Sequence, residues 1–179
     1  PKAPDDLPPS RLFEGINWAI VRDGWTPDGS LFALTCGEYW NHTHADESSF
    51  ILYSGGKPLV IDSGGCEYSR DEYLSYFVRS EAHNVVLWEN QGQPKEGPFR
   101  CRTVPGEIHG WVSSPHYTYF YADATGPYAS VLSRNVRHII AMDGVYVLVD
   151  DLRAYKPGVF SWLLHPEGKY DVEKQSVSI

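Results

Sequence analysis

The chain has 179 residues, of which 42% are hydrophobic, and this suits a single globular core, so we expect one domain over residues 1–179. Its formal net charge of −8 argues against nucleic acid as a partner, because a nucleic-acid-binding face needs clustered Lys and Arg. No stretch approaches the roughly eighteen consecutive apolar residues of a membrane-spanning helix, so no membrane partner is expected.

Short strands are predicted along the whole chain. Aromatic residues make up 14% of it, and Gly and Pro recur throughout, which favours an all-β protein. Apolar or alternating runs separated by turn signals lie at residues 17–21, 31–35, 49–53, 59–61, 84–88, 108–112, 117–122, 131–141, 145–149 and 159–164. Asp143 and Gly144 suit a type I′ hairpin turn between two of these strands. We therefore predict an antiparallel β-sandwich of about ten or more strands.

One short helix is predicted over residues 69–79. Ser69 could cap its N-terminus, and Tyr73, Tyr76 and Phe77 would share one face at the helical spacing. The chain starts without Met and ends in a strand-like run, so we expect a piece of a longer protein. Its three cysteines are odd in number and lack CxxC spacing, which indicates neither a disulfide framework nor a cysteine zinc site.

Three side chains that bind divalent metals lie on or beside predicted strands: His44, Asp62 and His83. Two imidazoles and one carboxylate would hold zinc, or another divalent ion, with one coordination position open. His42 and His44 are two residues apart, so on an extended strand both side chains would point to the same face. The sequence therefore predicts an open metal site assembled from several strand ends.

Other interpretations use the same residues. Asp46 or Glu47 could orient a ligand imidazole without binding the metal itself. Residues 37–55 approach the first metal-binding motif of cupins, although their spacings differ by about one residue and no second motif follows. A non-catalytic carbohydrate-binding sandwich is a third interpretation. Its stacking face would comprise Trp88, Trp111 and residues 117–121.

Four segments in order resemble the heparinase II/III-like family of polysaccharide lyases. They are H-x-H-x-D at residues 42–46, D-x-G at 62–64, a Tyr-bearing segment, and A-H-N at 82–84, and the resemblance is strongest over residues 15–95. The family's enzymes have a helical α/α toroid domain followed by a β-sandwich domain. The resemblance implies that this chain is the sandwich domain, a fragment that lacks the preceding toroid.

The resemblance also implies roles for individual histidines. His44, Asp62 and His83 match the family's zinc ligands, and His42 matches the catalytic histidine that faces the substrate in the cleft. The family's metal is usually understood as stiffening the cleft wall, and a Lewis-acid role on the substrate carboxylate is the alternative.

A tyrosine and an arginine are further candidates. Tyr73 matches the tyrosine that the sandwich places near the sugar, with Tyr68 as the alternative, and Tyr73 could instead be core packing. Arg79 could contact a uronate carboxylate or form a surface ion pair. Such lyases cleave uronic-acid-containing glycans by β-elimination, removing the C5 proton and expelling the oxygen at C4. The principal tyrosine and the residue that neutralises the carboxylate come from the helical domain, so we expect the isolated chain to be inactive.

The implied partners are an anionic polysaccharide or oligosaccharide and the missing helical domain, and a second copy in a homodimer is a further candidate. The acidic net charge disfavours an anionic substrate unless arginines form a local positive patch. The candidates for this patch are Arg70, Arg79, Arg100 and Arg102. Since the polymer cannot enter the cytoplasm, the resemblance implies a periplasmic or secreted bacterial protein.

Overall fold

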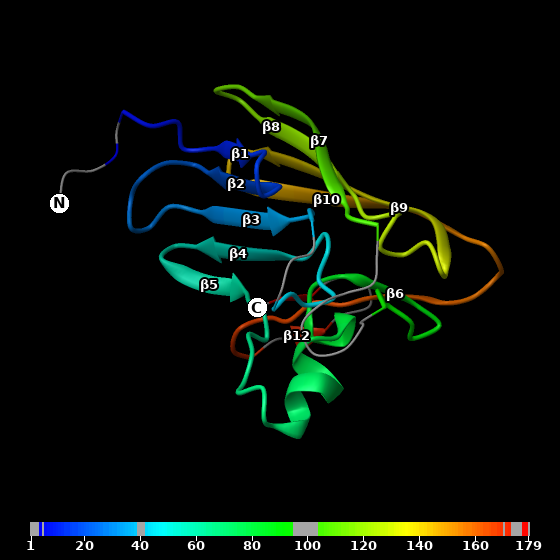
Figure 1. Ribbon diagram of the computed structural model, residues 1–179. Coiled ribbons are helices and arrows are strands. Elements are labelled where there is room, and N and C mark those ends of the chain that lie inside the picture. The colour runs from blue at the N-terminus through cyan, green and yellow to red at the C-terminus, as the bar shows by residue number, and fades with distance from the viewer. Residues whose placement is uncertain are drawn as a thin grey trace.

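Two antiparallel sheets make up most of the computed structural model (Figure 1). It describes residues 4, 6–38, 42–94, 104–169, 171–172 and 177–178. The five-stranded sheet has the order β1-β2-β3-β4-β5, with β1 (Arg11–Phe13), β2 (Trp18–Arg22), β3 (Leu31–Thr35), β4 (Phe50–Ser54) and β5 (Lys57–Val60). The four-stranded sheet has the order β10-β9-β8-β7, with β7 (Glu107–Ser113), β8 (Thr118–Asp123), β9 (Leu132–Met142) and β10 (Val145–Ala154).

Two smaller strand pairs complete the described structure: β11 (Phe160–Trp162) with β6 (Val86–Trp88), and β12 (Asp171–Val172) with β13 (Val177–Ser178). The short strands β1 and β12 are not predicted by the sequence pattern, which needs about four residues to reveal an alternation, whereas β13 falls in the strand-like run near the end of the sequence. None of the helices in the described ranges is long and apolar enough to cross a membrane. The candidate patch residues Arg100 and Arg102 lie outside the described ranges.

The hydrophobic core lies between the two large sheets. Buried and less buried residues alternate along β3, where Phe32 and Leu34 face the core, because successive side chains of a strand point to opposite faces. The opposite layer contributes Phe120 from β8 and Ile139 from β9, both completely buried. The predicted antiparallel β-sandwich is therefore confirmed.

The hairpin between β9 and β10 is also confirmed. Met142 pairs with Val145 across a two-residue turn, and Asp143 and Gly144 both have positive φ angles, 50° and 76°. Two successive left-handed residues define the type I′ turn, which matches the twist of the flanking strands. This turn sets the register of the two longest strands of the fold.

The one short helix predicted within residues 69–79 is present, but it is shorter and its main element is not α-helical. Residues Tyr73–Phe77 form a π-helical turn, η1, in which the Val78 N–H donates to Tyr73 O, five residues back, at 3.2 Å. A 3₁₀ turn, η2 (Ser80–Ala82), follows it. Because a π turn contains more residues than an α turn, Tyr73 is buried while Tyr76 is 39% exposed. The shared aromatic face predicted from α-helical spacing is wrong.

Candidate metal centre

The segment that carries His42 and His44 is a loop between β3 and β4. The prediction that both histidines project from one face of an extended strand is wrong, because His42 is left-handed with φ = 65°. Ser48, near the end of the same loop, also has φ = 65°. A left-handed conformation costs a residue other than Gly about 1 kcal/mol or more, and it persists only where surrounding contacts impose it.

Contacts from a later part of the chain hold this loop in place. The Ala45 N–H donates to Val78 O at 2.9 Å, and the Ser80 hydroxyl donates to Ala45 O at 2.8 Å. The side-chain amide of Gln93 binds both backbone groups of Glu47, each at 3.0 Å. The loop that carries the first histidines is thereby attached to the segment that carries His83.

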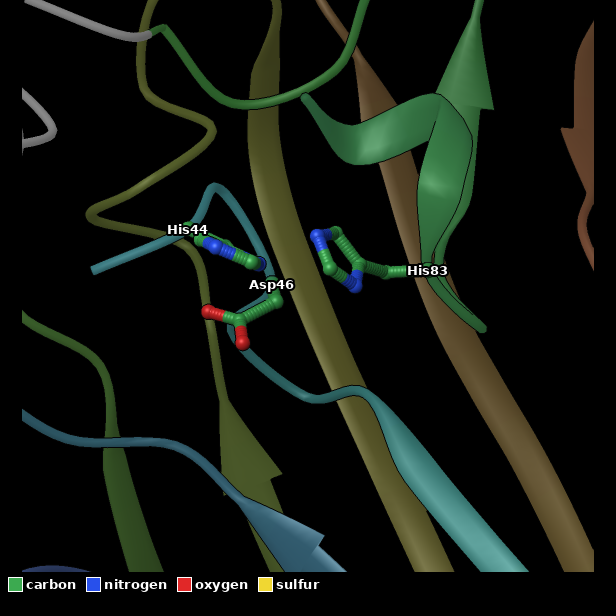
Figure 2. Close-up of side chains that lie close together, drawn as sticks. All are labelled: His44, Asp46 and His83. Carbon is green, nitrogen blue, oxygen red and sulfur yellow. The ribbon is translucent and has the colours of Figure 1, made fainter. Parts of the chain in front are cut away.

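Three metal-binding side chains meet at the end of the sandwich. His44, Asp46 and His83 each offer one ligand atom, and these atoms all lie within 4.8 Å of one another. Figure 2 shows His44 and Asp46 reaching from the loop before β4 toward His83, which follows η2. Asp46, expected only behind a ligand imidazole, therefore lies close enough to be a ligand itself.

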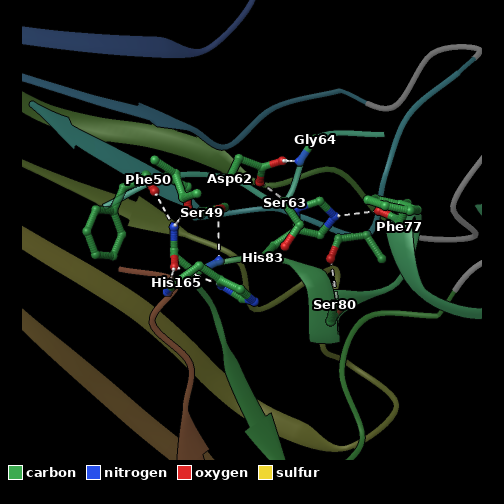
Figure 3. A network of polar contacts seen from close by, with 12 residues as sticks. Ser49, Phe50, Asp62, Ser63, Gly64, Phe77, Ser80, His83 and His165 are labelled. Atoms are coloured by element: carbon green, nitrogen blue, oxygen red, sulfur yellow. Dashed lines mark hydrogen bonds and ion pairs between the residues drawn. The ribbon is translucent and has the colours of Figure 1, made fainter. Parts of the chain in front are cut away.

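Asp62, the carboxylate expected as a ligand, lies two residues beyond β5 and contacts His83 directly. Its Oδ2 lies 2.6 Å from Nδ1 of His83, whose Nε2 lies 3.1 Å from Phe77 O (Figure 3). Burial by itself lowers the pKa of His83, but the hydrogen bond to Asp62 and the nearby carboxylates outweigh it and raise that pKa. Because both partners are acceptors, they stabilise the form of His83 in which both ring nitrogens carry a proton.

The donor set fits zinc. Two imidazoles and two carboxylates are nitrogen and oxygen ligands of the kind that zinc binds, and a divalent ion at Nδ1 of His83 would replace its proton. The Nε2–H of the same ring would keep Phe77 O as its acceptor, the outer contact that usually orients a ligand histidine. The structure thus brings His44, Asp46 and His83 together, and Asp62 joins them through its contact with His83.

A cavity of about 430 Å³ opens beside this cluster and is lined by His42, His44, Tyr68 and Tyr73, among others. The Tyr68 hydroxyl lies 2.7 Å from Nδ1 of His42, and the Tyr68 side chain is 54% exposed. Tyr73 is only 2% exposed, and its ring packs edge-on against Tyr68 with centroids 4.7 Å apart. This geometry favours Tyr68, the alternative, over Tyr73 as the tyrosine that faces a substrate.

A second cavity, of about 680 Å³, shares His42 and His44 with the first. Its lining joins the turn between β1 and β2 to the loop that carries His42 and His44. Among the described residues that line either cavity there is no Arg or Lys, and the charged ones are carboxylates and histidines. The acidic lining residues are Glu14, Glu38, Asp46, Glu47 and Glu67.

The predicted arginine patch is not supported by the arginines that the structure describes. Arg79 forms an exposed ion pair with Glu81 at 3.0 Å, and Arg70 forms another with Glu72 at 2.9 Å. Each arginine is therefore already compensated by a carboxylate two residues along. Of the two interpretations of Arg79, the surface ion pair is the one seen.

Glu47 is a buried carboxyl in the lining of the larger cavity, and only 5% of its surface is exposed. Within the described ranges its Oε2 has no hydrogen-bond partner. Burial, reinforced by the charge of Asp46, raises its pKa from 4.5 to about 8. At pH values between 4.5 and about 8, this carboxyl keeps its proton in the native state, whereas the unfolded chain has lost it. The free energy of unfolding therefore falls as the pH rises through this range.

Glu47→Gln should therefore flatten the pH dependence of stability. In the metal-free protein, the free energy of unfolding should fall by up to roughly 4 kcal/mol between pH 5 and 8, and the Gln variant should lack most of this decline. Urea unfolding at both pH values in the presence of a chelator measures it. Glu14→Gln, which alters an exposed carboxyl of the same cavity, is the control and should keep the full decline. An unchanged decline in Glu47→Gln would mean that Glu47 is ionised in the native state.

Asn84, the last residue of the A-H-N motif, has a role in the site that the sequence did not predict. Its side-chain nitrogen donates to Phe50 O and Ile61 O, both at 2.8 Å, and its Oδ1 accepts from the His165 N–H at 2.7 Å. Phe50 begins β4 after the histidine loop, and Ile61 precedes the aspartate ligand. One buried amide next to His83 therefore ties together the three segments that carry the candidate metal ligands. The only sign of this role in the sequence is that Asn84 directly follows His83 in the A-H-N motif.

The fold and the site define an antiparallel β-sandwich with a candidate metal centre and a cleft at one end. The model of the family described as "Heparinase II/III-like, C-terminal" matches residues 5–178. The chain belongs to this family, so the resemblance stated from the sequence motifs is confirmed. A heparin-sulfate lyase of Bacteroides thetaiotaomicron is 28% identical over 89 residues, which cover 42% of this chain and 13% of that protein.

Solved structures share the fold. A heparinase III, the BT4657 gene product, superposes with a TM-score of 0.76 at 18% identity, covering 92% of this chain and 25% of its own. The heparan sulfate lyase HepC from Pedobacter heparinus superposes with a TM-score of 0.72 at 16% identity, covering 87% and 24%. The chain thus spans about a quarter of the length of these structures.

Two alternatives are not supported. The cupin interpretation is wrong, because the chain belongs to the heparinase II/III-like family and folds as two packed sheets. The stacking face of a carbohydrate-binding sandwich does not form as expected, since Trp88 and Trp111 pack against the core and Phe120 is completely buried.

Proposed function

We propose that this chain is the zinc-binding β-sandwich part of a polysaccharide lyase that cleaves uronic-acid-containing glycans by β-elimination. The observation that carries the proposal is the convergence of His44, Asp46 and His83, with Asp62 in contact with His83, beside the exposed pair of His42 and Tyr68. β-Elimination needs a proton donor and a proton acceptor that are held in place and open to the substrate. The His42–Tyr68 pair, next to the candidate ligand cluster and beside a cavity, meets this need.

The zinc site would act by holding the histidine loop. His42 and His44 are separated by one residue, so fixing the ring of His44 also fixes the backbone from which His42 reaches the cavity. When bound, the ion would also supply positive charge at a cleft whose described lining contains no Lys or Arg. We favour the positioning role over Lewis-acid chemistry at the substrate.

His42 and Tyr68 would hold and move a proton at the cleft. Elimination requires a base for the C5 proton and an acid for the departing oxygen at C4, and a positioned group of either kind contributes roughly 10²- to 10⁴-fold in rate. The 2.7 Å contact between the Tyr68 hydroxyl and Nδ1 of His42 lets the two side chains exchange a proton. Tyr73 packs behind Tyr68 and would keep its ring in place.

A lyase must also neutralise the uronate carboxylate, and this chain offers little for that task. Its described arginines near the cleft, Arg70 and Arg79, are paired with Glu72 and Glu81. The neutralising group and the principal tyrosine would come from the remainder of the protein, as in the family's helical toroid. We therefore expect no elimination by the isolated chain, and because its substrate is a polymer, we expect the whole protein to work in the periplasm or outside the cell.

Metal content tests the proposal first. Mass spectrometry of the purified chain should find about one zinc per chain, and this zinc should be lost when His44 and His83 are both changed to Ala. The double variant His109→Ala with His116→Ala removes two histidines outside the cluster and should retain the metal. A folded wild-type chain that binds no divalent metal would refute the zinc site.

Elimination activity tests the enzymatic part. In the longer protein that contains this chain, His42→Ala should abolish the ultraviolet absorbance of an unsaturated uronate product while the zinc content stays the same. Full activity of His42→Ala, or elimination catalysed by the isolated chain, would contradict the assigned division of roles.

A further inference from the structure

Arg137 is a completely buried cation in the middle of β9, and the proposed reaction does not use it. Its Nε and one terminal nitrogen bind the two carboxylate oxygens of Asp150, on the neighbouring strand β10, at 2.7 and 3.0 Å. Asp150 also accepts a hydrogen bond from the indole nitrogen of Trp162 at 2.8 Å. A guanidinium held by two parallel hydrogen bonds to one carboxylate has a fixed plane as well as a fixed position.

The remaining terminal nitrogen of Arg137 binds two backbone carbonyls that lie far apart in the sequence. It donates to Ser48 O and to Asn84 O, each at 2.8 Å. Ser48 is the left-handed residue at the end of the histidine loop, and Asn84 directly follows His83. One nitrogen therefore joins the segment that carries His44 and Asp46 to the segment that carries His83.

Packing leaves the guanidinium little freedom to shift. Its central carbon lies 5.4 Å from the ring centroid of Phe50 and 5.8 Å from that of Trp162. A buried ion pair is weak support for stability, because removing two charges from water offsets most of their attraction. A hydrophobic pair would fill this space at less cost, which indicates that the polar contacts to the two carbonyls are the reason for an arginine here.

We propose that Arg137, oriented by Asp150, is the positioning residue that sets the separation between the His44 segment and the His83 segment from the opposite sheet. The inference rests on the proposed metal site for its functional meaning, but the positioning itself is a property of the metal-free protein. The planar fork of arginine reaches Asp150 and both carbonyls at once, and lysine cannot do so.

Arg137→Lys is the main test variant, because it keeps the charge and most of the volume. Arg134→Met is the matched control, since Arg134 also lies on β9 and pairs with a β10 carboxylate, that of Asp151, but on the exposed face. We expect Arg137→Lys to weaken zinc binding at least about tenfold in a chelator competition, and to alter the visible spectrum of the cobalt-loaded protein. Arg134→Met should change neither.

Nitrogen NMR of the histidine rings provides a readout without metal. In the chelator-treated protein, Arg137→Lys should shift the ring signals of His44 and His83, and Arg134→Met should leave them in place. Should Arg137→Lys fail to fold, Asp150→Asn removes the orienting charge at nearly constant shape and should shift the same signals. Unchanged ring signals in a folded variant would overturn the inference. If the wild-type chain binds no metal but these signals still shift, the zinc proposal fails and the positioning role stands.

Discussion

Asn84→Ala should lower the free energy of unfolding by about 4 kcal/mol and leave the domain partly unfolded at 37 °C. The substitution removes the partner of two buried carbonyls, Phe50 O and Ile61 O, and of the His165 N–H. Each buried polar group left without a partner costs about 1 to 3 kcal/mol, and the three groups belong to different segments that no other side chain joins in the same way. Thermal and urea unfolding followed by circular dichroism measure the effect.

Two further variants make this prediction specific. Asn84→Asp keeps the acceptor for His165 but loses the donor to both carbonyls, so it should be nearly as destabilising as Asn84→Ala. Gln91→Ala, which truncates an exposed amide nearby, should change stability by less than about 0.5 kcal/mol. A loss below about 1 kcal/mol in Asn84→Ala would show that water or a shift of the backbone satisfies these groups.

Asp62→Asn should weaken zinc binding by more than about a hundredfold, whereas Asp46→Asn should weaken it by only about tenfold. The two carboxylates compete for the role of third ligand. Nε2 of His83 is engaged with Phe77 O, so the ion would bind at Nδ1, and Oδ2 of Asp62 already lies 2.6 Å from Nδ1. Asp46 lies within the 4.8 Å cluster with His44 and His83, and its charge helps to raise the pKa of His83.

Chelator competition on the two Asn variants distinguishes the carboxylates, because each substitution keeps the side chain's size and removes only its charge. Asp71→Asn, on the exposed segment before η1, is the control and should bind zinc as the wild type does. The opposite order, with Asp46→Asn the weaker binder, would make Asp46 the ligand and Asp62 the residue that orients His83 from behind.

Local sequence signals predicted the secondary structure wherever neighbouring residues decide it. The Asp143 and Gly144 turn depends on two residues that tolerate positive φ, and the alternation along β3 depends on which side chains prefer the core. The segment around Tyr73 was mispredicted because α and π turns place residues at similar spacings. In the folded chain the ring of Tyr73 contacts Tyr68 and His44, neighbours that a helical spacing does not reveal.

In the candidate site, too, some features follow from the sequence and others only from the tertiary structure. The sequence by itself determined which residue types are present: the histidines of H-x-H-x-D, the aspartate after β5, the histidine before Asn84, and through them the family. Only the tertiary structure decided that Asp46 joins the candidate ligand cluster, that Tyr68 is the more exposed of the two tyrosines lining the cavity, and that Arg137 contacts both candidate ligand segments. These features depend on contacts between residues 35 to 89 positions apart, such as Ser80 with Ala45 and Arg137 with Ser48, which no local pattern encodes.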